Sequence, residues 1–91
     1  MQILVDGNIF NVDGINYETN TIYEFNGDYY HGNPEIYDSN IINKTTNKTF
    51  GYLYENTLLK EKILKNAGYN LITIWEKDYK LLNKIKYRYN V

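Results

Sequence analysis

The fold is decided by a five-residue stretch, Thr21-Ile-Tyr-Glu-Phe25, which is rich in residues that favour β-strands. In a strand, side chains alternate between the two faces, so Ile22 and Glu24 share one face and Tyr23 lies on the other. A carboxylate on the same face as an apolar core residue is uncommon and needs an explanation. The stretch therefore predicts a core strand that carries one candidate functional residue, Glu24.

The flanking sequence supplies the remaining elements. Two alternating apolar runs, 2–5 and 8–13, surround the dipeptide Asp6-Gly7, which is typical of two-residue β-hairpin turns. Residues 14–20 are turn formers, and residues 26–49 show no periodicity, so we expect a long functional loop there. Further along, the pattern predicts a helix over 50–67 that ends at Gly68, an apolar strand over 71–75 and a short basic helix over 78–88.

One face of the predicted 50–67 helix is mixed in character. At 100° per residue its apolar stripe comprises Tyr52, Leu53, Leu59, Ile63, Leu64 and Ala67. Asn56 and Lys60, one turn apart, fall inside this stripe. Lys60 therefore either reaches a site on the sheet or runs its aliphatic stem along the edge of the stripe.

This order of elements predicts a single α/β domain spanning residues 1–91, because so short a chain cannot divide into two cores. We expect a four-stranded mixed sheet built from the hairpin, a third strand, a crossover helix and a fourth strand, with flanking helices. A domain this small buries a modest fraction of its surface, which leaves room for support from a partner.

Composition excludes several classes of site. The chain has no cysteine and one histidine, which rules out a disulfide framework and leaves too few ligands for a tetrahedral zinc site. It has neither an apolar run of the roughly 20 residues needed to span a bilayer nor a secretion signal. We therefore expect a cytoplasmic or nuclear protein that is not secreted.

Charge is segregated along the chain. Residues 1–43 contain seven acidic residues and no Lys or Arg, whereas residues 44–91 contain all ten basic residues and four acidic ones. An acidic half beside a basic half suits a cation site next to a phosphate-binding surface. Codon bias in an AT-rich genome is an alternative origin for the lysines, but it does not explain their segregation.

Three residues form the candidate chemical constellation. Asp13 ends one predicted strand and Glu24 lies near the end of the next, so their carboxylates can converge at one end of the sheet if the strands are antiparallel. Hard divalent cations such as Mg²⁺ prefer such oxygen ligands. His31, the one histidine, has the side chain best suited to proton transfer near neutral pH. The alternative is that the acids are solvated strand-end charges and that the loop histidine is incidental.

The same residues resemble a known family. Val12-Asp-Gly14, the run from Glu18 to Pro34, and the later Leu53-Tyr-Glu-Asn-Thr57, Ala67-Gly-Tyr-Asn70 and Ile74-Trp-Glu76 occur in the order found in the Vsr-like branch of the PD-(D/E)XK nucleases. That branch includes very-short-patch-repair endonucleases, phage homing endonucleases and nuclease modules of large DNA viruses and mobile-element polymerase genes. The likeness covers residues 8–79 and implies a restriction-endonuclease-like core acting on DNA.

The resemblance implies specific roles. Asp13 and Glu24, with the backbone carbonyl of Phe25, resemble the ligands of Mg²⁺, for which Mn²⁺ can substitute. Asn26 stands where the family's motif has Lys, which leaves it a positioning role and gives acid–base work to His31. Asp28 resembles a recurrent acid that holds a second metal or orients His31.

DNA contacts are also implied. Tyr29 and Tyr30 occupy positions where relatives press aromatic rings into the DNA stack, although packing in the core is the alternative for any one tyrosine. Asn56 and Lys60 are the helix candidates for contact with the substrate. Phosphate contacts are expected from the basic residues near the C-terminus: Lys77, Lys80, Lys84, Lys86 and Arg88.

The resulting hypothesis is a metal-dependent DNA endonuclease, one copy of which nicks a strand while two copies cut both. The family's usual helix before the first strand is missing from this sequence, which is compatible with a minimal form, a homodimer or a piece of a larger polypeptide. Two rival hypotheses stay open. One is a DNA-binding module without cleavage activity, and the other is a protein-interaction domain with a tyrosine-rich surface.

Overall fold

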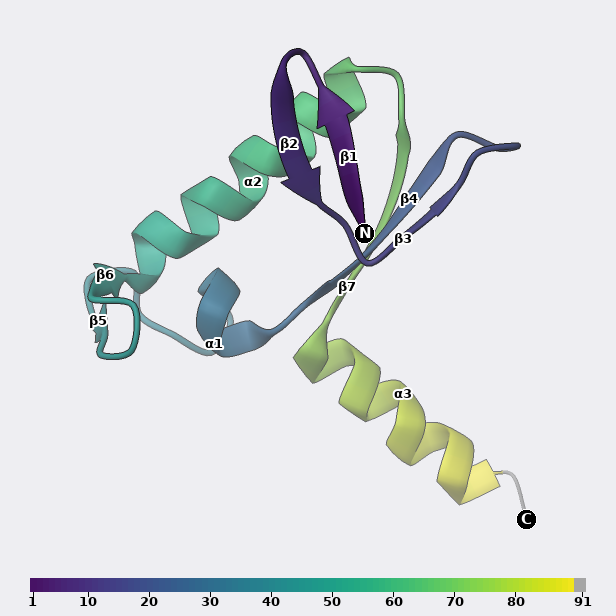
Figure 1. Cartoon of the computed structure of the whole chain (residues 1–91). Helices are drawn as coiled ribbons and strands as arrows, with labels where there is room; N and C mark the ends of the chain where they lie inside the picture. The colour runs from purple at the N-terminus through teal and green to yellow at the C-terminus, as the bar shows by residue number, and fades with distance from the viewer. Residues whose placement is uncertain (90–91) are drawn as a thin grey trace.

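The computed structural model describes the backbone of residues 1–89 and the side chains of residues 1–84. Three helices and seven short strands alternate along this part of the chain (Figure 1). Their bounds are β1 Gln2–Val5, β2 Asn8–Asn11, β3 Gly14–Asn16, β4 Thr21–Asn26, α1 Asp28–His31, β5 Ile42–Asn43, β6 Lys48–Thr49, α2 Phe50–Asn66, β7 Asn70–Trp75 and α3 Glu76–Tyr89. The molecule is thus a mixed α/β protein, as expected.

The central sheet has three strands in the order β3-β4-β7. β3 pairs antiparallel with β4, while β7 pairs parallel with β4 from Thr21 opposite Asn70 to Asn26 opposite Trp75. α2 is the connection between β4 and β7, which is the predicted crossover. The prediction of a single four-stranded sheet was wrong. The β1–β2 hairpin forms a separate two-stranded sheet, and part of the expected turn at 14–20 is the strand β3.

The hairpin turns as its sequence predicts, because Asp6 and Gly7 both adopt positive φ, at 50° and 81°. Its buried side chains, Ile3 and Val5, join Val12, Ile22 of β4 and Leu64 of α2 in the main core. Figure 1 shows the hairpin beside the C-terminal half of α2. The hairpin therefore covers the sheet and the helix from one side rather than extending the sheet.

α2 begins and ends where predicted. The side chain of its N-cap, Thr49, accepts a hydrogen bond from the backbone N–H of Tyr52, and Gly68 just after the helix takes a φ of 95°. The buried face differs from the predicted stripe. Phe50, Thr57 and Leu64 are its buried residues.

Several residues of the predicted stripe lie toward solvent instead. Tyr52, Leu59 and Ala67 are exposed, and so is Asn56. The predicted stripe differs from the observed buried face because the prediction followed apolar residues alone. The face of α2 that lies over the end of β4 also includes the polar residues Thr57, Lys60 and Glu61.

The 26–49 segment is an ordered loop rather than an irregular one. It contains the one-turn helix α1 and the β5–β6 ribbon, and it is fastened by two fully or almost fully buried amides, Asn33 and Asn43. The side-chain amide of Asn43 donates to the carbonyl of Tyr29 and its oxygen accepts from two backbone N–H groups. This anchoring holds α1 against α2 and fixes the position of His31.

α3 leaves the body of the molecule at the end of β7 and projects away from it (Figure 1). It covers 76–89, slightly more than the predicted 78–88. The apolar pattern of this helix predicts Leu81, Leu82 and Ile85 on an inward face, but Leu81 and Leu82 are exposed, and Ile85 lies outside the residues whose side chains are described. None of the helices in residues 1–89 has the length and apolar character needed to cross a bilayer.

Candidate functional site

Asp13 lies in the bend between β2 and β3, and its side chain reaches the edge of β4. β3 pairs with β4 only as far as Tyr23, so the β4 backbone beyond that residue has a free edge on this side. Asp13 Oδ2 accepts a hydrogen bond of 2.6 Å from the backbone N–H of Phe25. The carboxylate is thereby fixed beside the C-terminal half of β4.

Glu24 lies on the face of β4 that is turned toward α2, and its side chain is only 11% exposed. The Lys60 Nζ lies 2.8 Å from Glu24 Oε1, so the two side chains form an ion pair. Burial raises the pKa of Glu24, Lys60 opposes the rise, and the nearby Asp13 carboxylate adds to it. The two acids predicted to converge are therefore close enough to influence each other.

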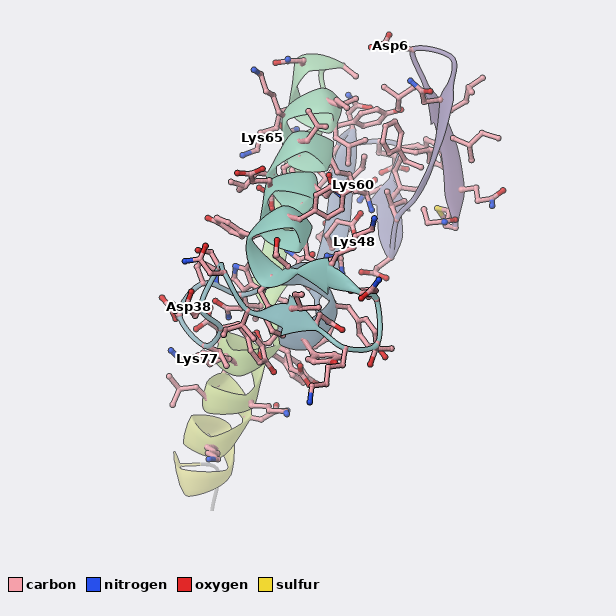
Figure 2. All side chains as sticks on the ribbon, turned by 90° about the vertical axis from the view of Figure 1, so that its left-hand side faces the viewer. Asp6, Asp38, Lys48, Lys60, Lys65 and Lys77 are labelled. Atoms are coloured by element: carbon pink, nitrogen blue, oxygen red, sulfur yellow. The ribbon has the colours of Figure 1, made fainter. Side chains whose placement is uncertain are left out.

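Lys60 joins three elements. From α2 its ammonium donates to the carbonyl of Asn11 at the end of β2 and pairs with Glu24 on β4. Figure 2 shows Lys60 on the side of α2 that faces the hairpin. Of the two alternatives left open by the sequence, the structure favours the lysine that reaches the carboxylates.

His31 ends α1 and faces α2. Its Nδ1 lies 3.1 Å from the hydroxyl oxygen of Thr57, and that hydroxyl donates to the carbonyl of Leu53 at 3.0 Å. Because the one hydroxyl proton is used on Leu53, the network assigns the imidazole proton to Nδ1, which then donates to Thr57 and leaves Nε2 as an acceptor. Burial lowers the pKa of His31, and the positive charge of Lys60 lowers it further. The neutral imidazole is thus favoured near pH 7.

These side chains line one small cavity. Glu24, Asn26, His31, Thr57 and Lys60 border it, and Glu61, Leu64 and Leu71 complete the lining. The cavity offers about 20 Å³, which is room for one water molecule. Asn26, at the position of the family's lysine, is 4% exposed and belongs to this lining. The sequence analysis missed Thr57, and a hydroxyl on the buried face of a helix was the signal that could have indicated it.

Asp28 does not belong to this group. Its carboxylate accepts a 2.8 Å hydrogen bond from the Asn33 side chain, and its backbone N–H donates to Glu76 Oε1. It is 7% exposed and faces α3 rather than His31. The structure therefore does not support the expected role of Asp28 in orienting His31. Asp28 instead stabilises the loop through its hydrogen bonds.

The candidate DNA-binding residues are dispersed. Tyr29 packs edge-on against Phe50 and Tyr37, and its hydroxyl forms a hydrogen bond with the hydroxyl of Thr45, so it is a packing residue. Tyr30, in contrast, is 57% exposed. Asn56 is exposed on α2 and away from the cavity lining. Among the basic residues, Lys77 pairs with Glu35 and Lys80 with Glu76. Lys86 and Arg88 lie outside the residues whose side chains are described.

The donor set fits one hard divalent cation. Phe25 N–H points toward Asp13, and since the N–H and C=O of one strand residue point to the same side, the Phe25 carbonyl faces Asp13 as well. Two carboxylates and a carbonyl suit Mg²⁺, which keeps several of its own waters, and Mg²⁺ would share the Glu24 carboxylate with the Lys60 ammonium. Within the described residues no group of three or more His, Asp or Glu side chains is arranged so that the three could hold a metal ion together.

Comparison with known proteins gives no match for this chain among protein-family models, curated protein sequences or solved structures.

Proposed function

We propose that this chain is a metal-dependent DNA endonuclease with a restriction-endonuclease-like core. The observation that supports it is that Glu24, near the end of β4, lines one cavity with Lys60 and His31 and lies close to the Asp13 carboxylate. A strand with an antiparallel neighbour on one side and a parallel, helix-connected neighbour on the other agrees with the core that the sequence motifs imply. The cleaved bond is the phosphodiester of DNA.

Each residue then has a distinct task. Asp13, Glu24 and the Phe25 carbonyl would hold Mg²⁺, which when bound would supply a Lewis acid for the phosphate oxygen. His31 Nε2 accepts a proton from the attacking water, because its Nδ1–H is committed to Thr57. The Lys60 ammonium, which lies beside Glu24, donates a hydrogen bond to a phosphate oxygen. It thereby supplies the positive charge that the family's lysine provides from the position that Asn26 occupies here.

Substrate contacts follow from the exposed cations and aromatic rings. Tyr30 stacks on or beside a base, and Lys84 with its basic neighbours contacts phosphates. Because Lys77 and Lys80 are already paired with acids, each contributes less than a free lysine. DNA affinity is expected to fall steeply with added salt.

The decisive experiment is nicking of supercoiled plasmid with Mg²⁺ or Mn²⁺. We expect Asp13→Asn and His31→Gln each to lower the rate by about 100-fold or more, since general acid–base and metal contributions are of that size. Asp6→Asn is the matched control, because it removes an acid from the hairpin turn while Asn tolerates the same positive φ. Full activity in both site variants would exclude this mechanism.

The alternative is a DNA-binding module without cleavage activity. It is favoured by the Lys60–Glu24 ion pair, which neutralises the carboxylate without any metal. It predicts salt-sensitive DNA binding that is unaffected by Mg²⁺ and by Asp13→Asn, together with no nicking by the wild-type protein. Absence of DNA binding at low salt would instead favour the protein-interaction domain.

A further inference from the structure

The Lys60 ammonium contacts the same carboxylate that is proposed to hold a metal ion. Its Nζ lies 2.8 Å from Glu24 Oε1, and the Glu24 side chain is only 11% exposed. A carboxylate with so little access to water is stabilised by a nearby positive charge, and Lys60 supplies that charge. Glu24 thus has a cationic partner that belongs to the chain itself.

A second contact holds the ammonium next to the segment that bears Asp13. Lys60 Nζ also donates a hydrogen bond to the carbonyl of Asn11, which ends β2 two residues before Asp13. Lys60 and Asp13 both lie close enough to Glu24 to shift its pKa, in opposite directions. The ammonium is therefore held beside the carboxylate pair by β2 on one side and β4 on the other.

The ammonium and a divalent cation would use the same negative charge. Asp13 and Glu24 carry two negative charges when both are ionised, and the positive charge of Lys60 cancels one of them. A divalent cation bound to the Glu24 carboxylate would also be repelled by the ammonium beside it. The lysine therefore lowers the affinity of the carboxylate pair for a divalent cation.

Lys60 is able to turn from Glu24 toward a bound anion. Its side chain is 30% exposed, so the ammonium reaches solvent from its position on α2 (Figure 2). A lysine ammonium is a point charge on a flexible four-carbon stem, and it bonds to any strong acceptor within reach. The anionic oxygen of a phosphate group is such an acceptor. A substrate phosphate would therefore compete with Glu24 for the ammonium.

We propose that Lys60 makes metal binding dependent on substrate: its ammonium holds Glu24 until a phosphate group of DNA binds the ammonium, and a divalent cation then takes the freed carboxylate. The inference rests on the proposed function, because it assigns a regulatory role within that same site. Linkage requires the reverse effect as well, so the metal raises the affinity for DNA by the same factor. Without DNA the site binds a divalent cation weakly.

Titration of the full chain with Mn²⁺, without DNA, tests the first half of the proposal, with free Mn²⁺ measured by electron paramagnetic resonance. Lys60→Met should bind Mn²⁺ about 10-fold more tightly than the wild type, because repulsion between a monovalent and a divalent cation in contact is of that size even when screened as in water. Lys60→Gln removes the charge but keeps a donor for Asn11, and it should show the same gain. Lys62→Met, at an exposed position of the same helix, is the matched control and should bind as the wild type does.

The affinity for DNA tests the second half and includes the unaltered protein. Fluorescence anisotropy of a labelled duplex is measured with and without Ca²⁺, which takes oxygen ligands as Mg²⁺ does, at equal ionic strength. The gain in DNA affinity that Ca²⁺ produces should be about 10-fold larger in the wild type than in either Lys60 variant. Circular dichroism checks that each variant stays folded.

Two kinds of failure can be told apart. Equal or weaker Mn²⁺ binding in both Lys60 variants, or an equal gain from Ca²⁺ in all proteins, overturns the role of Lys60 and leaves the metal site standing. Mn²⁺ binding that is absent from the wild type and both Lys60 variants, or that survives Asp13→Asn unchanged, contradicts the metal site itself and this inference with it. Both readouts are binding, so neither depends on cleavage of DNA.

Discussion

Replacing Lys60 with methionine tests the electrostatics of the site most sharply. Methionine keeps much of the aliphatic stem but removes the ammonium that lies 2.8 Å from Glu24 Oε1 and bonds the Asn11 carbonyl. Exposed ion pairs contribute about 0–1 kcal/mol, whereas breaking a buried pair costs about 3–5 kcal/mol. Because Lys60 is 30% exposed and Glu24 is 11% exposed, we expect an intermediate loss of about 2 kcal/mol at pH 7.5.

The loss should depend on pH. Burial already raises the pKa of Glu24, and Lys60 is the group that lowers it, so its removal raises that pKa further. A carboxyl whose pKa is higher in the folded state than in the unfolded state favours folding when protonated and opposes it as the pH rises through the folded pKa. The difference in unfolding free energy between Lys60→Met and wild type should therefore be largest above neutral pH and shrink toward pH 4.

Urea denaturation at several pH values measures this difference. A loss of about 2 kcal/mol at pH 7.5 corresponds to a fall in Tm of about 10 °C for a domain of this size. The double variant Glu24→Gln/Lys60→Met should recover most of the stability, because no unpaired charge is left. Lys62→Met, at an exposed position of the same helix, is the control. A loss that does not change with pH, or a double variant as unstable as the single one, would refute this account.

Three further predictions concern the surroundings of the site. The His31 imidazole should titrate below pH 6.5 by NMR, and the stability it contributes above pH 6.5 should decline as the pH falls through its lowered pKa, a dependence that His31→Gln removes. Gly32→Ala should cost more than about 3 kcal/mol or prevent folding, since a Cβ at this φ of +67° would overlap the Phe50 carbonyl, and thermal denaturation measures it. Thr49→Ala should cost about 1 kcal/mol in urea denaturation because it removes the N-cap of α2.

The elements that could be predicted from sequence are those with a strong local signal. Asp6-Gly7 requires positive φ in both residues, and Gly68 takes the left-handed conformation after α2, so the hairpin and the end of the helix follow from the sequence. The membership of the sheet could not be predicted in this way. Whether the hairpin extends β4 or packs across it depends on contacts between residues distant in sequence, such as Val5 with Leu64 in one core.

The structure places the predicted site residues near the end of β4, but their contacts could not be predicted from the sequence. The sequence indicated Asp13, Glu24 and His31 because each residue type was unusual in its place. It misplaced Asp28, because spacing along a loop does not reveal that the carboxylate turns to Asn33. The sequence analysis also missed Thr57, because a search for apolar periodicity gives no weight to a hydroxyl group. In the structure the Thr57 hydroxyl orients the imidazole of His31.

The electrostatics of the site support the proposed function. Glu24 is largely buried beside Lys60, and Asp13 lies close enough to raise the pKa of Glu24. Drawing two carboxylates together costs stability, and strained electrostatics of this kind is concentrated at functional sites. Lys60 offsets that cost only in part, and under the proposed function a divalent cation would offset more of it.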